Sequence, residues 1–160
     1  MFGIFKKQQV DLCSKVQGQL FINDHPAKGI HVHRILTYSG EQEFSDSTVT
    51  DSEGCLSLPK YSILSRKPNK PFFESFVHQY IYAEHNSENM KLWFATRPGK
   101  DDLRAFEKKL GNMRCDLTDP VAQFEFDSGF YNVKMSASGK CRWQSDFKII
   151  DNFAESSNDK

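Results

Sequence analysis

The clearest structural signal in the chain is the sequence FVHQYIYAEHNSENMKLWFAT, which begins at residue 76 and ends at residue 96. Two runs rich in aromatic and β-branched residues, 76–84 and 90–96, flank the polar segment 85–89. Such runs on either side of a short polar turn are typical of an antiparallel hairpin. The stretch therefore predicts two paired strands that lie side by side in a sheet.

Further extended segments, separated by turn residues, lie on both sides of this hairpin. Before it, we expect strands over residues 14–22, 29–38, 43–51 and 55–58. After it, we expect strands over residues 121–126, 131–135 and 141–149. Residues 61–71, which contain Pro68 and Pro71, are predicted to form a surface loop. Gly18 is expected to mark a twist or a bulge in the first strand.

One segment, residues 101–110, has helical spacing instead. Its apolar residues fall on one stripe of a helix: Leu103, Phe106 and Leu110. Asp101 or Asp102 is expected to cap the start, and Gly111 is expected to end the helix in a left-handed conformation. We therefore predict a mostly β fold, an antiparallel β-sandwich of seven to nine strands with one short helix.

Length and composition fit one folded domain. The chain has 160 residues, of which 38% are hydrophobic and 13% aromatic, far too many for a disordered protein. We expect a single domain over residues 14–150, an N-terminal segment over residues 1–13, and a disordered polar tail over residues 151–160.

Charge and hydropathy patterns exclude several classes of partner. The 21 basic and 21 acidic residues cancel, so no global field attracts nucleic acid, and no nucleic-acid partner is expected. No apolar run approaches the ~18 residues of a membrane helix, so no integral membrane segment is expected. The start, MFGIFKKQQ, lacks the order of a signal peptide. We therefore expect cytoplasmic localisation and leave the periplasm open.

The first sixty residues resemble a known family of β-sandwiches. The pattern comprises Val16-x-Gly18-x-Leu20, then His25-Pro26-Ala27-x-Gly29-Ile30-x-Val32, then Thr48-Val49-Thr50-Asp51-x-x-Gly54-x-Leu56-x-Leu58-Pro59. This order resembles the carboxypeptidase regulatory-like, or transthyretin-like (prealbumin-like), group, and the chain is similar to small uncharacterised bacterial proteins. The resemblance implies a transthyretin-like sandwich, in which Asp51 binds the amides of the turn before Gly54. The group includes adhesin stalks, enzyme appendages, transport proteins and inhibitors, so it implies no single function.

Two histidines, His31 and His33, raise the question of a metal site. Side chains two residues apart on a strand lie on one face about 7 Å apart, and His78 or His85 could complete a zinc or copper site. No third ligand is indicated nearby, so we favour a solvated outward face with no metal and no cofactor. An enzyme using His31, His33 and His78, either metal-dependent or hydrolytic, is the alternative.

Other catalytic signals do not occur. The chain has neither a Gly-x-Ser-x-Gly elbow nor a glycine-rich phosphate loop, so we expect no catalytic residues. The four cysteines, at positions 13, 55, 115 and 141, form no Cys-x-x-Cys pair and are expected to be buried thiols. A Cys13–Cys141 disulfide stays open, and it would indicate a structural envelope module.

The aromatic residues of the central region suggest protein recognition instead. Tyrosine, tryptophan, phenylalanine and arginine are common anchors in interfaces. The candidate protein-binding residues are Phe72, Phe73, Tyr80, Tyr82, Trp93, Arg66 and Lys67. Strand alternation places Tyr80 and Tyr82 on one face and sends Trp93 and Phe94 to opposite faces.

These observations together lead to a functional hypothesis. We expect a non-catalytic binding protein whose partner is another protein, such as a toxin or effector. A bacterial immunity protein, which would neutralise a toxin by occluding its active site, is the specific form of this hypothesis.

Overall fold

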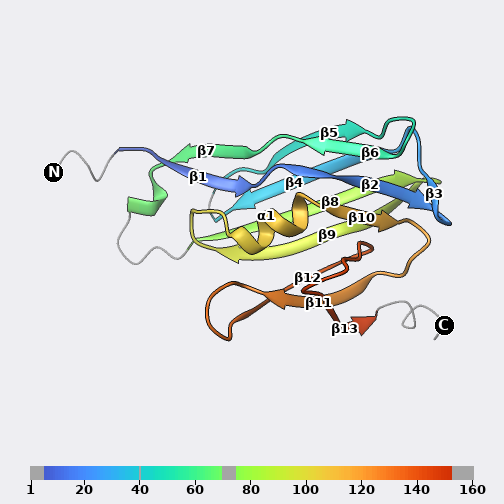
Figure 1. The fold of residues 1–160 in the computed structure, drawn as a ribbon. Helices are drawn as coiled ribbons and strands as arrows, with labels where there is room; N and C mark the ends of the chain where they lie inside the picture. The colour runs from blue at the N-terminus through green and yellow to red at the C-terminus, as the bar shows by residue number, and fades with distance from the viewer. Residues whose placement is uncertain (1–5, 40, 70–74, 153–160) are drawn as a thin grey trace, which may run out of the picture.

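The computed structural model describes residues 6–39, 41–69 and 75–152 (Figure 1). Within these ranges the larger of two layers is a sheet of seven strands: β4 (His31–Tyr38), β5 (Phe44–Val49), β8 (Phe76–His85), β9 (Glu88–Pro98), β11 (Ala122–Asp127), β12 (Lys134–Gly139) and β13 (Lys148–Asn152). Their order in space is β13-β11-β12-β9-β8-β4-β5, and every neighbouring pair is antiparallel.

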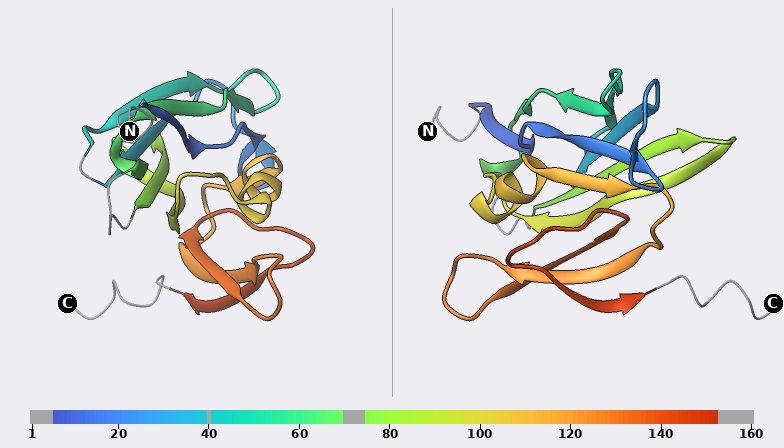
Figure 2. Two further views of the ribbon diagram at one scale, coloured as in Figure 1. Left: turned by 90° about the vertical axis from the view of Figure 1, so that its left-hand side faces the viewer. Right: turned by 45° about the vertical axis from the view of Figure 1, so that its right-hand side comes forward.

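The second layer is built from the other strands and the helix: β1 (Gln8–Cys13), β2 (Val16–Ile22), β3 (His25–Pro26), β6 (Cys55–Leu58), β7 (Tyr61–Ser65), β10 (Met113–Asp116) and the helix α1 (Arg104–Leu110). Strand β1 pairs with β7, while β2 pairs with β3, β6 and β10. Only the β2–β10 pair is parallel among the strand pairs of the described ranges. Figure 2 shows the seven-stranded sheet curving around β1, β2, β10 and α1.

This architecture confirms the predicted mostly antiparallel β-sandwich with one short α-helix in the described part of the chain. The same part contains thirteen strands, more than the seven to nine expected. One reason is that residues 61–71, predicted as a loop, begin with β7, which pairs with β1. The other additions are β3 and β10, two short strands where the sequence predicted none. Two predicted strands also had wrong bounds. The segment 131–135 starts in a turn and β12 begins only at Lys134, and in the segment 141–149 Cys141 forms an isolated bridge and β13 begins only at Lys148.

The central hairpin forms as predicted, but its turn has two residues, Asn86 and Ser87, and is shorter than the predicted segment 85–89. Asn86 and Ser87 both have positive φ, 52° and 61°, which is the conformation that matches the twist of paired strands. The register continues from His85↔Glu88 to Phe76↔Pro98 and shifts once, between Ile81 and Tyr82. The β8–β9 hairpin therefore provides the two longest strands of the large sheet.

The register shift is a β-bulge centred on Leu92. Tyr82 pairs with Lys91 and Ile81 pairs with Trp93, which leaves Leu92 as the extra residue of β9. A side chain at Gly139 of β12 would collide with the Leu92 carbonyl group, so glycine is needed where β12 approaches the bulge.

Gly18 has a similar role, which differs from the predicted twist or bulge. A Cβ atom there would collide with the backbone of Met113, so the glycine permits the close parallel approach of β10 to β2.

The turn predicted at Asp51 is confirmed in detail. Asp51 Oδ1 accepts hydrogen bonds from the amides of Glu53 and Cys55, each at 2.9 Å. Gly54, with φ of +78°, closes the turn by donating its amide hydrogen to the Asp51 carbonyl at 3.0 Å. The local sequence therefore determines this connection into β6.

The helix is shorter than predicted, and its ends are formed differently. It begins at Arg104, and its N-cap residue, Leu103, makes no side-chain capping bond. Asp102 lies instead beside Arg97, with 3.9 Å between Oδ1 and Nε, and burial raises the pKa of this carboxyl group. Gly111 has φ of −77°, so the predicted left-handed ending was wrong.

A cluster of polar side chains joins the large sheet to the N-terminal strand. Three fully buried side chains on neighbouring strands point into the core: Arg34, Gln79 and Arg97. They donate hydrogen bonds to backbone carbonyl groups at the end of β1 and just beyond it: Arg97 to Asp11, Gln79 to Leu12 at 3.0 Å, and Arg34 to Ser14 at 3.4 Å. We call these three residues the polar cluster.

These contacts correct the predicted domain boundary. Residues 1–13 were expected to lie outside the domain, but Val10, Leu12 and Cys13 are fully buried in the shared core. Strand β1 belongs to the fold because the polar cluster satisfies carbonyl groups that burial removes from water. At the other end, β13 extends to Asn152, and the rest of the predicted tail, 153–160, lies outside the described residues.

The disulfide is another correction. Cys141 is bonded to Cys115 of β10, and the two residues also form an antiparallel bridge. Cys13 is a buried free thiol, and its burial raises its pKa to about 11. Cys55 is free and exposed. The Cys13–Cys141 pairing is wrong because β1 ends beside Arg34 in the core, whereas residue 141 pairs with β10.

Replacement of Gln79 by leucine should destabilise the protein strongly. The substitution removes the partner of the Leu12 carbonyl and also the acceptor of the Trp93 indole N–H, at 3.0 Å. Each buried group left without a partner costs about 1–3 kcal/mol, so a loss of about 2–5 kcal/mol is expected in urea unfolding. Gln17→Leu, at an exposed position of β2, is the matched control and should change the unfolding free energy by less than about 0.5 kcal/mol.

The disulfide and the thiols can be tested together. Non-reducing peptide mapping should recover a Cys115–Cys141 linked peptide, and alkylation of the native protein should label Cys55 alone. Cys13 should react only after unfolding, because it is buried and its raised pKa keeps it protonated. Cys115→Ala with Cys141→Ala should lower the unfolding free energy by about 2–4 kcal/mol. Recovery of a peptide that links Cys13 to Cys141 would contradict the assignment.

Candidate functional site

The outward surface of the large sheet carries a row of stacked rings across β4, β8 and β9. The row consists of His33, Tyr82, Tyr80 and Phe94, which we call the aromatic face. The ring centroids of His33 and Tyr82 are 5.0 Å apart, and those of Tyr82 and Tyr80 are 5.1 Å apart, both in stacked geometry. Phe94 meets Tyr80 edge-on at 6.1 Å. Each ring therefore has a fixed neighbour in the free protein.

Strand alternation and cross-strand register together place these rings. On β4, even-numbered residues from Val32 to Tyr38 are buried, so His33 lies on the outer side. His33 pairs directly with Tyr82, and Tyr80 pairs directly with Phe94. Side chains directly opposite each other on paired strands interact, and alternation places Tyr80 and Tyr82 on the same face of β8, so the two effects together bring the four rings into one row.

A shallow depression lies beside the aromatic face. It has a volume of about 390 Å³ and is lined by Ile35, Thr37, His78, Tyr80, Lys91 and Phe94. Lys91 Nζ lies 5.4 Å from the centroid of the Phe94 ring, and His78 Nδ1 lies 2.8 Å from Thr96 Oγ1. The lining of the depression thus combines aliphatic and aromatic side chains with one cation and one imidazole.

Two polar groups set the electrostatics of the row. His33 Nε2 lies 3.1 Å from Glu84 Oε1, so protonation of the ring would create an ion pair at this end. Burial raises the pKa of the Tyr80 phenol, and Tyr82 adds to the effect. Tyr80 therefore keeps its hydroxyl proton at neutral pH and presents both a donor and an acceptor to a partner.

Some of the predicted binding residues lie on this surface. Tyr80 and Tyr82 share one face, and Trp93 and Phe94 lie on opposite faces, as alternation predicted; the face that carries the two tyrosines is the outer one. The inclusion of Trp93 was wrong, because its side chain is fully buried and its ring packs 5.6 Å from Phe106 of α1. Phe72 and Phe73 lie outside the described residues.

The predicted basic residues lie away from the aromatic face. Arg66 is exposed just after β7, and Lys67 begins a short 3₁₀ helix, where its Nζ lies 3.7 Å from Glu41 Oε1. Within the described ranges, no hydrogen bond, ion pair or ring contact joins either residue to Tyr80 or Tyr82. The structure therefore does not unite all the predicted candidates in one site.

The histidines considered as metal ligands do not converge. His31 and His33 lie near one end of β4, whereas His78 pairs with Thr37, four residues beyond His33 along the strand. Four strand residues span about 13 Å, which is too far for one ion to bind all three imidazoles. Across the described part of the chain, no group of three or more His, Cys, Asp or Glu side chains has the arrangement of a metal site.

Two members of the aromatic face were not among the predicted binding residues. His33 was predicted to lie on a solvated outward face, or else to bind a metal, and Phe94 was predicted only to lie on the face opposite Trp93. Whether Trp93 or Phe94 faces outward depends on how side chains alternate along β9. The bulge at Leu92 shifts this alternation by one residue, so Trp93 points inward and Phe94 points outward. The run Leu92-Trp93-Phe94 is apolar throughout, so the sequence alone does not indicate where the bulge lies.

The fold and the aromatic face define the class of this protein, an all-β sandwich with an exposed sheet surface of aromatic residues. The chain belongs to the family described as Domain of unknown function (DUF6795), whose model matches residues 16–120. That range contains the whole aromatic face and ends before β11. No curated protein and no solved structure matches the chain. The resemblance to transthyretin-like sandwiches stays a prediction.

The length and the apolar character of the helices determine whether a helix can span a membrane. None of the helices in the described ranges is long and apolar enough to cross a bilayer.

The assignment of faces on β9 can be tested with two neighbouring residues. Trp93→Ala should lower the unfolding free energy by about 3–5 kcal/mol, because it empties a fully buried site. Phe94→Ala should cost less than about 1 kcal/mol, because 43% of this side chain is already exposed. Urea unfolding of both variants provides the measurement. Comparable losses, or a larger loss for Phe94→Ala, would contradict the bulged register.

Proposed function

We propose that this protein is a non-catalytic binding protein that docks a protein partner on the aromatic face. The observation that carries the proposal is the row of four rings, already stacked on one another and still accessible on a rigid sheet. Aromatic side chains dominate the energetics of interfaces. Because the rings are ordered before binding, little conformational entropy is lost when a partner covers them.

The surroundings of the row support the same function. Interfaces combine an apolar centre with a polar rim. Here the centre is Tyr80 with Phe94, and the rim includes Lys91, His78 and Glu84. This mixture suits a protein surface with complementary charge better than it suits a purely apolar ligand.

The dimensions of the site set the size of the contact. Neighbouring strands are about 4.8 Å apart, so three strands span only about 10 Å. A standard interface buries about 800 Å² on each partner, which requires more surface than the row itself. On the β5 edge, Val49 is 48% exposed and pairs with His31, so the interface should extend in this direction.

The specific form of the proposal is an immunity protein that occludes a toxin or effector. Its support is the small size of the chain, the lack of catalytic motifs and the resemblance to sandwiches that include inhibitors. Co-expression with the product of a neighbouring toxin gene tests this form. Protection of the cells by the wild type, and not by a variant of the aromatic face, is the expected result.

A second candidate function, a structural envelope module, is favoured by one observation. The chain has a buried disulfide between Cys115 and Cys141, and disulfides persist mainly in oxidising compartments. This observation favours a periplasmic or surface location over the expected cytoplasm, and it is compatible with binding through the aromatic face. Fractionation of cells that express the protein from its own gene would separate the two locations.

The binding proposal predicts that loss of two rings abolishes capture of the partner. With the wild-type chain as bait, proteins retained from the native source should be absent when the bait carries Tyr80→Ala and Phe94→Ala. For an isolated partner, the Kd should rise at least about 25-fold, which corresponds to a hot-spot loss of about 2 kcal/mol.

The control is Leu64→Ala on β7, which removes another exposed apolar side chain from a different sheet. This variant should retain the partner with unchanged affinity. Equal retention by the wild type and the double variant, with both shown to be folded by circular dichroism, would contradict the proposal.

A further inference from the structure

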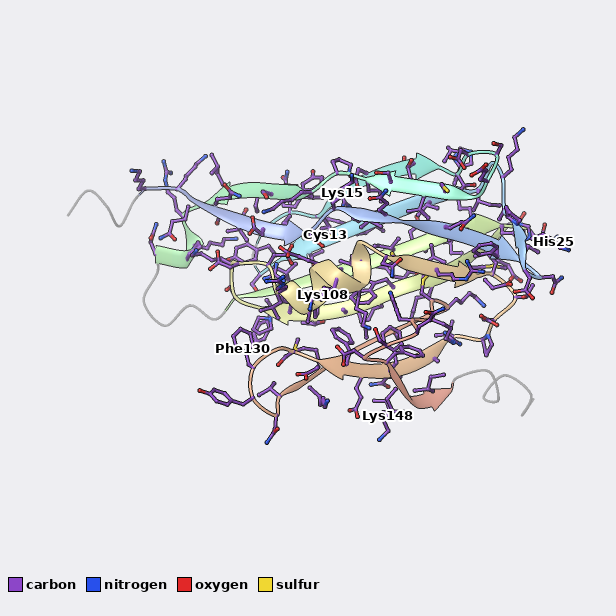
Figure 3. The ribbon with its side chains drawn as sticks, in the orientation of Figure 1. Cys13, Lys15, His25, Lys108, Phe130 and Lys148 are labelled. Carbon is purple, nitrogen blue, oxygen red and sulfur yellow. A yellow bond between two sulfur atoms is a disulfide. The ribbon has the colours of Figure 1, made fainter. Side chains whose placement is uncertain are left out.

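The loop between β11 and β12 exposes an unusual concentration of apolar side chains. Phe130 is 59% exposed, Tyr131 is fully exposed and Val133 is 54% exposed, all within four residues. The other large exposed hydrophobic residues of the described ranges occur singly or in one pair, on strands. Figure 3 labels Phe130, which lies at the end of the molecule where this loop projects. We call residues 130–133 the apolar tip.

The apolar tip is held in place by its own backbone. Val133 donates its amide hydrogen to the Phe130 carbonyl at 2.9 Å, and Gly129 donates to Asp127 Oδ1 at 3.1 Å. Tyr131 adopts a left-handed conformation, with φ of 45°, at the apex of this turn. The aromatic side chains are thus presented outward by a hydrogen-bonded turn.

A basic cleft adjoins the apolar tip. This hollow of about 990 Å³ has residues 128 and 129 on one side and the helix α1 on another. Five cationic side chains line it: Arg104, Lys108, Lys109, Arg114 and Arg142. Two carboxylates, Asp127 and Asp146, also line it. The cleft therefore has a local excess of positive charge, although the chain as a whole has none.

The five cationic side chains of the cleft differ in whether they already have partners within the protein. Lys109 donates to the Ser145 carbonyl at 2.9 Å, and Arg142 donates to the Pro120 carbonyl at 2.7 Å, so both help to form the walls. Arg114 lies over the ring of Phe21, 4.0 Å from its centroid. No ion pair involves Arg104 or Lys108 within residues 6–39, 41–69 and 75–152, and both are exposed.

Arg104 and Lys108 also face the same way. They are four residues apart on α1, so they lie on one side of the helix. The two carboxylates of the cleft already accept backbone hydrogen bonds: Asp127 from Gly129, and Asp146 from the amide of residue 127 at 2.8 Å. The exposed cations are therefore available to an external anion. Figure 1 shows the start of α1 and the β11–β12 loop at the same end of the molecule.

We propose that this end of the protein docks on an anionic phospholipid surface. Phe130 and Tyr131 would enter the headgroup region, where aromatic side chains partition favourably. Arg104 and Lys108 would contact the lipid phosphates and carboxylates. A projecting tip suits a fluid bilayer, which closes around inserted side chains, whereas a protein partner would need a pocket of matching shape.

The two features act together. A short apolar insertion or a small group of cations gives only weak membrane binding alone, and stable association requires two such signals. Each basic residue near an anionic surface strengthens binding by about fivefold, and added salt weakens this contribution. The proposal is independent of the aromatic face, which lies on β4, β8 and β9.

The test is co-sedimentation of the full chain with vesicles. The wild type should bind vesicles of equimolar phosphatidylcholine and phosphatidylserine, and it should bind vesicles of phosphatidylcholine alone at least about tenfold more weakly. The variant with Phe130→Ala and Tyr131→Ala should lose binding to both. The variant with Arg104→Gln and Lys108→Gln should lose about tenfold or more on the anionic vesicles only.

Matched controls separate this effect from folding and from the proposed function. Lys28→Gln changes an exposed lysine in the turn that follows β3, and Leu64→Ala changes an exposed apolar residue of β7, so both should bind vesicles like the wild type. The Tyr80→Ala, Phe94→Ala variant should also bind normally. Absence of vesicle binding by the folded wild type, or binding that is unaffected by the tip substitutions, would overturn the proposal. A protein partner would then be the better explanation of the exposed apolar tip.

Discussion

The structure depends on the way in which buried polar side chains hold the N-terminal strand against the large sheet. Arg34, Gln79 and Arg97 project from three neighbouring strands and donate hydrogen bonds to carbonyl groups at the end of β1. A buried carbonyl group without a partner costs as much as a lost hydrogen bond or more. The two layers therefore have one favourable position relative to each other, and simple apolar contact would specify it less sharply.

This inner arrangement also determines what the sheet presents outside. Gln79 accepts the hydrogen bond of the Trp93 indole, which fixes Trp93 in the core beside Phe106. Once Trp93 points inward, its neighbour Phe94 must point outward, where it meets Tyr80. The position of Phe94 on the aromatic face is thus linked to a hydrogen bond in the core. The end of the protein that carries the apolar tip and the basic cleft is built separately, from α1 and the β11–β12 loop.

Much of the fold could be predicted because its signals are local. The central hairpin, the Asp51 turn and the shared face of Tyr80 and Tyr82 follow from turn residues and from alternation over a few positions. The errors arose where distant segments meet. The side of the sheet on which Trp93 lies depends on a bulge that Gly139 accommodates. The pairing of Cys141 depends on its position beside β10. Neither relation is encoded by spacing along the chain.

By itself, the sequence determined the mostly β class, the existence of the central hairpin and the placement of both tyrosines on one side of β8, because each of these follows from residues close together in the chain. Only the tertiary structure decided that β1 belongs to the domain, that Phe94 rather than Trp93 is exposed, and that Cys115 bonds to Cys141. It also decided which cations adjoin the apolar tip. The reason is that register, bulges and buried hydrogen bonds are set between strands that are far apart in sequence, where no local pattern records which partner is chosen.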